Sequence, residues 1–226
     1  MKTIRLLICD DHHVVRAGLR SLLKAAEDIE VVGEAENGPL AVAQAKKLRP
    51  DVVLMDIAMP LLNGVEAARR ITTEVRSANV LILSSYNDDQ HLRQAVAAGV
   101  AGYLLKETAS EDLLLAIREI AKGNAFFSPA VTKRLSDQRR NQQAQPHSMA
   151  ASPLTTRQKE VVQLIAEGYS SKQMAGVMSL SIKTVEKHRQ ALMTTLDIHK
   201  IAALTRYAVA EGMIESLPVA SLSAST

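Results

Sequence analysis

Short apolar runs alternate with amphipathic segments through the first 128 residues. The runs cover residues 4–9, 30–34, 52–55, 80–83 and 102–105. In the segments between them, apolar residues recur every three or four positions, which is typical of helices with one buried face. Near-continuous apolar strands joined by helices indicate parallel strands buried on both sides. We therefore expect an α/β fold, with a doubly wound parallel sheet of five strands between helices.

The alternation ends near residue 128, and the chain from there to residue 150 has no apolar period. Residues 133–153 are rich in Gln, Arg and Ser, a composition typical of a linker. We expect an N-terminal domain over residues 1–128, a linker over 129–150, a second domain over 151–216 and a tail over 217–226.

The second domain has an all-helical pattern with closely spaced start and stop signals. Thr155 with Gln158, and Ser170 with Gln173, have the spacing of capping boxes, while Ser181 is a candidate cap for a third helix. A fourth helix is expected over residues 200–211. Short helices joined by tight turns predict a small four-helix domain that contains a helix-turn-helix unit.

Composition narrows the class of protein without naming it. The chain has 226 residues, and 47% of them are hydrophobic, which is enough for real cores and excludes disorder throughout. Its single cysteine, Cys9, has no partner for an internal disulfide, so we expect a reducing compartment, the cytoplasm. No secretory leader is expected, because Asp10 and Asp11 interrupt the N-terminal apolar stretch after a few residues. No membrane span is expected either, because no segment approaches the roughly 20 apolar residues that a span needs.

The net charge of +3 is unevenly distributed. Acidic side chains are in slight excess over residues 1–132, and basic ones are in slight excess over the rest of the chain. This asymmetry is compatible with a polyanionic partner for the C-terminal part, and equally with a solvated surface.

Polar residues follow four of the five predicted strands. Asp10 and Asp11 end the first strand, Asp56 the third, Ser84 the fourth and Lys106 the fifth. The carboxyl ends of parallel strands meet at one edge of a sheet, where ligands bind in such folds. Three carboxylates at close range repel one another unless a cation lies between them, and oxygen ligands of this kind suit Mg²⁺. The sequence thus predicts a magnesium site at this edge.

A carboxylate, a metal, an ammonium group and a hydroxyl together are suited to phosphoryl transfer. Each of these residues alone is more often part of a solvated turn or a helix cap. Their occurrence together, each directly after one of four predicted strands, favours a phosphoryl-transfer site. For His12 and His13, which follow the acidic pair, a solvated loop position is favoured over metal binding because Mg²⁺ prefers oxygen ligands.

Residues 1 to about 125 resemble a bacterial response-regulator receiver domain. The resemblance is carried by the acidic pair after the first strand, by "MDIAMPLLNG" around Asp56 and by "AGVAGYLLKETASEDLLLAI". It implies a flavodoxin-like strand order 2-1-3-4-5, a histidine kinase that phosphorylates Asp56, and a switch pair of Ser84 and Tyr103. The ligands that it implies for Mg²⁺ are Asp10, Asp11, Asp56 and the carbonyl of Ala58. On its own, Tyr103 is equally a half-buried aromatic of a strand.

The third helix of the second domain has two distinct faces. The face expected to pack carries Val185, His188, Leu192 and Leu196, and the opposite stripe carries Lys183, Lys187, Gln190 and Thr194. A stripe of this kind is more often a solvated helix surface than a DNA-reading one.

Residues 154–196 resemble the LuxR-type helix-turn-helix, and the whole chain is similar to NarL/FixJ response regulators. The resemblance implies a recognition helix over residues 182–196 in the major groove of double-stranded DNA. The implied DNA contacts are Lys183, Thr184, Glu186, Lys187 and Gln190. It also implies dimerisation through the fourth helix, for which Ile201, Leu204 and Ala208 are the candidates, and this suits a two-fold DNA site. On its own, the apolar spacing of this helix also fits an element that closes the small core. Gly176 inside the preceding helix and the pair Thr194-Thr195 depart from the family's pattern.

These expectations describe a two-component transcription factor that is not an enzyme beyond self-phosphorylation and autodephosphorylation. One alternative is an aspartyl-phosphate hydrolase or phosphatase, but such an enzyme would usually carry a second acid where this chain has Ala58. The other alternative is a protein-interaction regulator without DNA binding, which the Thr194-Thr195 departure leaves open.

Overall fold

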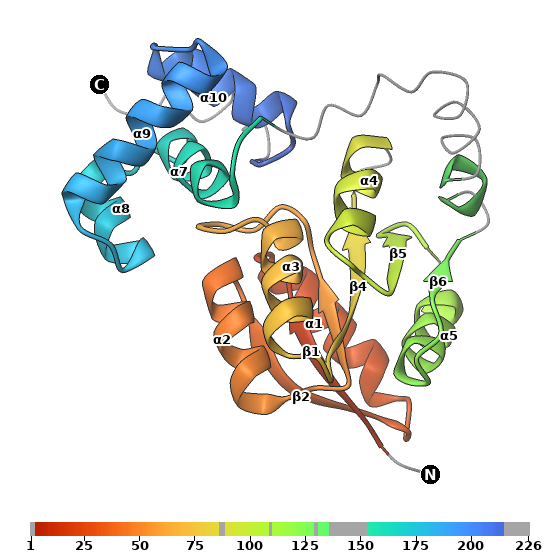
Figure 1. Cartoon of the computed structure of the whole chain (residues 1–226). Helices are drawn as coiled ribbons and strands as arrows, with labels where there is room; N and C mark the ends of the chain where they lie inside the picture. The colour runs from red at the N-terminus through yellow and green to blue at the C-terminus, as the bar shows by residue number, and fades with distance from the viewer. Residues whose placement is uncertain (1–2, 86–88, 109, 129–130, 136–152, 215–226) are drawn as a thin grey trace, which may run out of the picture.

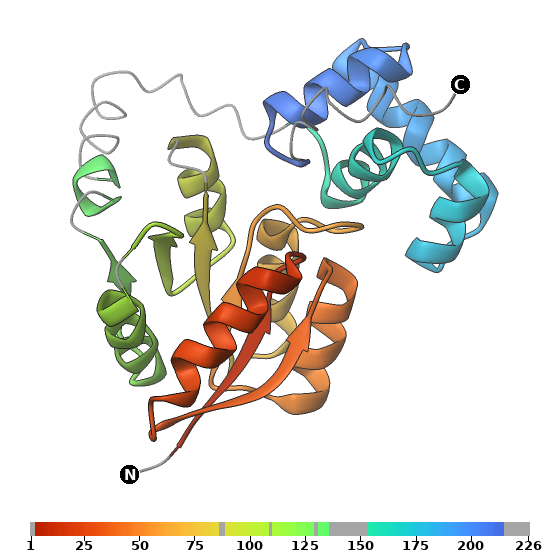
Figure 2. The same ribbon diagram turned by 180° about the vertical axis from the view of Figure 1, so that it is seen from behind.

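The computed structural model describes residues 3–85, 89–108, 110–128, 131–135 and 153–214 (Figure 1). Within them the chain folds into an N-terminal α/β domain and a C-terminal helical domain, as Figures 1 and 2 show from opposite sides. Most of the expected linker and the whole expected tail lie outside the described residues. None of the helices described is long and apolar enough to cross a membrane.

The N-terminal domain is a parallel sheet in the order β2-β1-β3-β4-β5-β6. Its strands are β1 (Ile4–Cys9), β2 (Ile29–Ala35), β3 (Val52–Met55), β4 (Asn79–Ser84), β5 (Gly102–Leu105) and β6 (Phe126–Phe127). The expected fold class and the order of the first five strands are confirmed. The sixth strand, parallel to β5, was not predicted, because two residues are too short to show a periodic pattern.

Two groups of helices cover the sheet. One apolar cluster joins one face of the sheet to α1 (His13–Lys24) and α5 (Ser110–Ala121), and a second joins the other face to α2 (Gly38–Leu48), α3 (Gly64–Glu74) and α4 (Asp89–Ala97). The central strands are therefore buried on both sides, as their apolar sequences predict. Val131, past the expected end of the domain, is only 3% exposed and packs in the second cluster.

The C-terminal domain consists of four helices around one small core. They are α7 (Thr156–Ala166), α8 (Ser171–Met178), α9 (Ile182–Leu196) and α10 (Ile201–Ala210). Both expected capping boxes are present, at Thr155 with Gln158 and at Ser170 with Gln173. Ser181 caps α9, since its side chain accepts a hydrogen bond from Thr184 N at 3.1 Å. These caps fix the tight turns that set α8 against α9.

The loop between β3 and α3 is folded tightly over the end of β3. Gly64 N donates to Ile57 O at 2.7 Å, and a Cβ at Gly64 would lie only 1.7 Å from Asp56 O. Only glycine permits this close approach. Leu61, at the tip of the loop, has a φ of 69°, a left-handed conformation that non-glycine residues rarely adopt.

Candidate functional site

The parallel register of β1 and β3 brings the acidic residues together. Cys9 pairs with Met55, so the next residues, Asp10 and Asp56, leave the two strands side by side. Carboxylate oxygens of Asp10, Asp11 and Asp56 lie, with a ring nitrogen of His12, within 4.8 Å of one another. Asp10 and Asp56 are only 2% and 3% exposed. Three carboxylates thus share one largely buried site at the carboxyl edge of the sheet.

Lys106 supplies the nearest positive charge. Its Nζ lies 2.8 Å from Asp10 Oδ2 and 3.0 Å from Asp56 Oδ2. The backbone N–H of Lys106 donates to Ser84 O at 2.8 Å, which fixes the end of β5 against the end of β4. The Lys106–Glu107 peptide bond is trans. The four strand ends singled out in the sequence therefore meet at one edge of the sheet.

Burial changes the acidity of the central carboxyl group. Desolvation raises the pKa of Asp56 from 3.8 to about 6, and the positive charge of Lys106 offsets part of the effect of burial. A buried carboxylate of this kind is destabilised as an anion, and a cation near it recovers free energy. The site therefore favours the approach of a divalent ion.

The chemistry of the donor set fits Mg²⁺. Asp11 Oδ1 and Asp56 Oδ2 are buried and accept no hydrogen bond, although His12 Nδ1 lies 2.8 Å from the former and Lys106 Nζ 3.0 Å from the latter. Buried acceptors without donors are rare in folded proteins unless an ion or a water satisfies them. Carboxylate oxygens are also the ligands that Mg²⁺ prefers. Ala58, the residue expected to add a carbonyl ligand, is 8% exposed and lies two residues after Asp56.

The two residues expected to act as a switch pair are both buried. Ser84 is 0% exposed at the end of β4, and Tyr103 on β5 is 2% exposed within the cluster that packs α2, α3 and α4 on the sheet. Tyr103 is thus a core residue in this conformation rather than a half-buried one.

Two further residues lie beside the acidic site: His12, expected in a solvated loop position, and Arg16, which the sequence did not single out. His12 is half exposed, but its Nδ1 lies 2.8 Å from Asp11 Oδ1 and 3.3 Å from Asp10 Oδ1. Arg16, on α1, is buried, and its Nη1 donates to Asp10 O at 2.7 Å. An arginine in an amphipathic helix normally indicates a solvated position, so this contact follows only from the way α1 crosses the strand ends.

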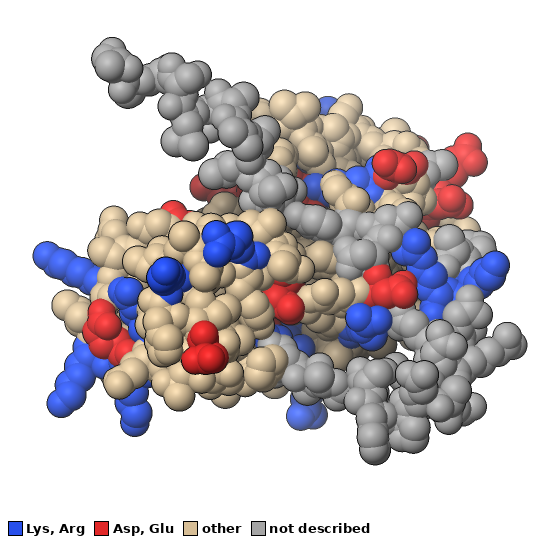
Figure 3. Space-filling model, turned by 90° about the horizontal axis from the view of Figure 1, so that it is seen from above, with Lys and Arg blue, Asp and Glu red and all other residues tan. Residues whose placement is uncertain are grey.

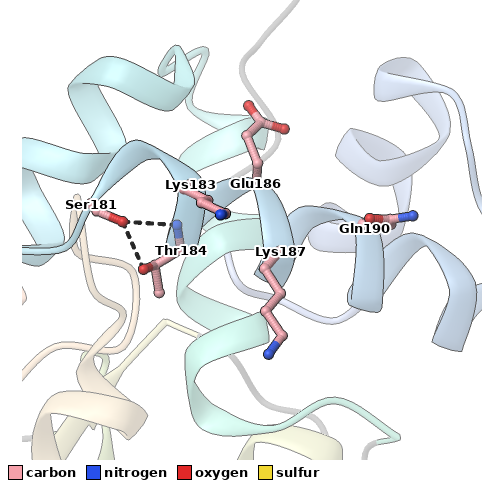
Figure 4. A pocket seen from close by; sticks show the side chains of 6 residues that line it. All are labelled: Ser181, Lys183, Thr184, Glu186, Lys187 and Gln190. Atoms are coloured by element: carbon pink, nitrogen blue, oxygen red, sulfur yellow. Dashed lines mark hydrogen bonds between the residues drawn. The ribbon is translucent and has the colours of Figure 1, made fainter.

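The outer face of α9 is a second candidate site. Ser181, Lys183, Thr184, Glu186, Lys187 and Gln190 line a shallow pocket along this helix (Figure 4). Lys183, Lys187, Gln190 and Thr194 are exposed, whereas Val185 and Leu192 are fully buried in the core of the domain. The two faces expected for this helix are therefore present. Figure 3 shows Lys and Arg side chains at the edge of the molecule, with acidic ones among them.

The choice of contact residues on α10 needs correction. Leu204 and Ala208 are 0% exposed and close the core of the C-terminal domain, whereas Ile201 is 56% exposed. Apolar residues spaced three and four apart mark the face of a helix that packs in its own core, so this spacing pointed to buried residues rather than to surface ones. Of the three candidates only Ile201 presents its side chain at the surface.

Comparisons with known proteins agree with this geometry. Residues 6–118 match the family model of the response regulator receiver domain, and residues 152–208 match that of the bacterial regulatory proteins of the luxR family. The chain is 36% identical over 213 residues to the response regulator protein VraR of Staphylococcus aureus, which covers 94% of this chain and 100% of VraR. The chain belongs to the LuxR-type response regulators.

Solved structures show the same domain pair. A structure of the RcsB response regulator of Salmonella typhimurium has a TM-score of 0.57 at 27% identity and covers 93% of this response regulator and 100% of that chain. The response regulator ChrA of a heme-sensing two-component system has a TM-score of 0.52 at 32% identity. This match covers 95% of the present chain and 100% of the ChrA chain. RcsB bound to a promoter in the presence of the phosphomimetic BeF₃⁻ has a TM-score of 0.59 at 26% identity. This match covers 91% of the present chain and 98% of the RcsB chain.

Family membership identifies the two domains of this response regulator. The N-terminal domain is the receiver, and its acidic site lies within the residues 6–118 that the family model matches. The C-terminal domain is the LuxR-type DNA-binding domain.

Proposed function

We propose that Asp56 accepts a phosphoryl group from the phosphohistidine of a histidine kinase, and that this event controls transcription from sites in DNA. The observation that carries the proposal is a buried carboxylate between two others and a lysine, in a chain that also presents an exposed basic helix. Phosphoryl transfer needs a nucleophile, positive charge around the transferring group and little water, and these residues provide all three.

The roles follow from the positions of the side chains. An Asp56 oxygen attacks phosphorus, an acyl-phosphate bond forms, the bond from phosphorus to the imidazole nitrogen breaks, and that imidazole takes a proton as it leaves. Asp10, Asp11, Asp56 and the carbonyl of Ala58 would hold Mg²⁺, whose charge offsets that of the phosphoryl oxygens. Lys106, already within 3.0 Å of Asp56, binds an oxygen of the product, and Ser84 holds another. Ser84 and Tyr103 then pass the change to the rest of the receiver.

The chemistry of the chain itself would be limited to self-phosphorylation from small donors and loss of the phosphoryl group. Ala58 stands where a phosphatase of this kind would carry its general acid, so the chain has no acid at that position to protonate a leaving alcohol. Turnover of an external phosphoester would contradict this assignment.

The DNA-binding step is proposed for the exposed face of α9. Lys183 and Thr184 suit phosphates or bases, while Glu186, Lys187 and Gln190 suit base edges, because Glu accepts from cytosine and Gln pairs with adenine. We place the protein in the cytoplasm, in keeping with its single buried thiol, as a homodimer on a two-fold DNA site. A solved structure of the relative RcsB contains two dimers bound to two parallel DNAs.

The test is a binding selection from random duplex DNA, followed by affinity measurements on the recovered sequence. We expect wild-type protein treated with a small phosphodonor and Mg²⁺ to bind more tightly than untreated protein, and Asp56→Ala to show no response. A selection that recovers no sequence would support instead a regulator that binds only proteins.

A further inference from the structure

His12 occupies a position that helix capping does not explain. It is the N-cap residue of α1, but its side chain makes no capping hydrogen bond. Ser, Thr, Asp and Asn are preferred at such positions because their oxygens accept from the first turn of the helix. The backbone N–H of His12 donates to Asp10 Oδ1 at 2.8 Å, and this contact holds the residue beside the acidic site. The identity of the side chain therefore has another physical reason.

The imidazole of His12 lies against two carboxylates. Its Nδ1 is 2.8 Å from Asp11 Oδ1 and 3.3 Å from Asp10 Oδ1. Although the first distance is short, Asp11 Oδ1 accepts no hydrogen bond from the described part of the chain. No ring N–H therefore points along the line between these two atoms. A nitrogen and an oxygen that approach one another without a hydrogen bond are arranged as two ligands of one ion are.

Lys106 does not fill this side of the site. Its Nζ contacts Asp10 Oδ2, whereas the imidazole of His12 is nearest to Asp10 Oδ1, so the two groups use different oxygens of one carboxylate. Asp56 is only 3% exposed, and its Oδ2 accepts no hydrogen bond although Lys106 Nζ lies 3.0 Å away. A buried acceptor in this state is rare in a folded protein unless an ion or a water satisfies it.

The spacing of the donor atoms fits a small divalent ion. One carboxylate oxygen from each of Asp10, Asp11 and Asp56 and a ring nitrogen of His12 lie within 4.8 Å of one another. Two ligands of a tetrahedral Zn²⁺ ion lie about 3.4 Å apart, because each is about 2.0–2.2 Å from the metal. The distance from His12 Nδ1 to Asp10 Oδ1 is already close to this value. The side chains of His12 and Asp11 are 50% and 30% exposed, so small rotations bring the rest of the set into range.

Ligand type, and not charge, separates the ions that this set accepts. Any divalent ion, together with Lys106, offsets the three carboxylate charges, and a neutral imidazole adds none. Mg²⁺ prefers oxygen ligands and keeps several waters, so it gains little from His12. Zn²⁺ binds imidazole nitrogen as well as carboxylate oxygen. His12 therefore adds affinity for Zn²⁺ without adding affinity for Mg²⁺.

We propose that the acidic site binds Zn²⁺ through Asp10, Asp11, Asp56 and His12, in competition with Mg²⁺. Four protein ligands complete a tetrahedral Zn²⁺ ion and leave no position for a phosphoryl oxygen. Mg²⁺ at the same carboxylates keeps positions that water or a phosphoryl group occupies. Zinc thus holds the receiver in an unphosphorylated form. The effect on phosphorylation rests on the proposed function, whereas zinc binding itself does not.

Calorimetric titration of the full-length protein with Zn²⁺ and with Mg²⁺, without a phosphodonor, tests the site. We expect wild-type protein to bind one Zn²⁺ ion that excess Mg²⁺ displaces. His12→Asn, which keeps a good N-cap residue, should bind Zn²⁺ at least about tenfold more weakly and Mg²⁺ within about twofold of wild type. The unchanged Mg²⁺ affinity also shows that the variant is folded. His13→Asn, a change at the exposed neighbouring histidine, is the matched control and should leave both affinities unchanged.

Co²⁺ in place of Zn²⁺ reports the coordination directly. Four-coordinate Co²⁺ absorbs visible light much more strongly than six-coordinate Co²⁺. Wild-type protein should therefore show an intense visible band that is absent from His12→Asn and from Asp11→Asn. The zinc site would be overturned by a wild-type protein that binds no Zn²⁺, by bound Zn²⁺ that Mg²⁺ does not displace, or by equal Zn²⁺ affinity in His12→Asn and wild type.

The second arm measures the rate of phosphoryl uptake from a small phosphodonor at a fixed Mg²⁺ concentration, with and without Zn²⁺. At a Zn²⁺ concentration ten times the dissociation constant measured with that Mg²⁺ present, the wild-type rate should fall by about tenfold. The rate of His12→Asn should fall by about twofold or less, relative to its own rate with Mg²⁺ alone. An undiminished wild-type rate, or an equal fall in both proteins, would overturn the closed coordination by His12. If Mg²⁺ alone gives no uptake in wild type, the proposed function fails, while the titrations still decide the zinc site.

Discussion

Burial and the charge of Lys106 act in opposite directions on Asp56. Its pKa of about 6 lies above its ordinary value of 3.8 because burial outweighs the attraction of Lys106. The sequence predicted the neighbours of Asp56, since strand ends in a parallel sheet share an edge. It could not predict the contacts of His12 and Arg16, because these depend on the path of α1 over that edge and not on a repeating pattern.

The shifted pKa of Asp56 predicts a stability change with pH in the absence of divalent ions. The folded state holds its proton up to about pH 6 and the unfolded state loses it near 3.8, so the contribution of Asp56 to stability falls as pH rises between these values and then stays constant. Asp56→Asn should therefore unfold with a free energy higher than wild type by about 1 to 3 kcal/mol near neutral pH. The difference should narrow at about pH 5. Urea titrations with a chelator present measure it, and an equal difference at both pH values would contradict the assigned cause.

The elements themselves were largely predictable. β1, β3 and β5 have the expected bounds, and α9 spans the expected residues 182–196, because apolar runs and caps mark them in the sequence. β2 and β4 extend one residue further at each end, and β6 was missed. The burial of Gln163 on α7 had no signal in the sequence, because the loop that covers this side chain lies about 100 residues earlier in the chain.

Gly176 gives a prediction at the scale of one helix. It lies inside α8 with no atom within 4 Å of a Cβ built on it, so an alanine fits without strain. Gly176→Ala should stabilise the DNA-binding domain by about 0.5–1 kcal/mol, because it removes backbone freedom from the unfolded chain. Gly64→Ala is the matched comparison and should destabilise the receiver, since its Cβ would collide with Asp56 O. Thermal unfolding of the two variants checks both signs; a loss of stability in Gly176→Ala would contradict the local packing described for α8.

At the scale of the whole molecule, the response regulator carries an acidic site in its receiver and an exposed basic helix in its DNA-binding domain. The exposed α9 face predicts DNA binding that weakens with salt. Lys187→Ala should lower affinity for the selected duplex by about tenfold and reduce the salt slope by about 1. Lys24→Ala, an exposed lysine on the receiver, serves as the control and should leave both unchanged. A Lys187→Ala protein with the affinity and slope of wild type would remove α9 from the DNA contact.

The central claim is that Asp56 takes up a phosphoryl group, and the mass of the intact protein tests it most directly. After incubation with a small phosphodonor and Mg²⁺, the wild-type chain should gain the mass of one phosphoryl group, and the gain should disappear when the metal is chelated. Asp56→Ala should gain nothing under the same conditions. An equal gain in Asp56→Ala, or none in wild type, would contradict the account.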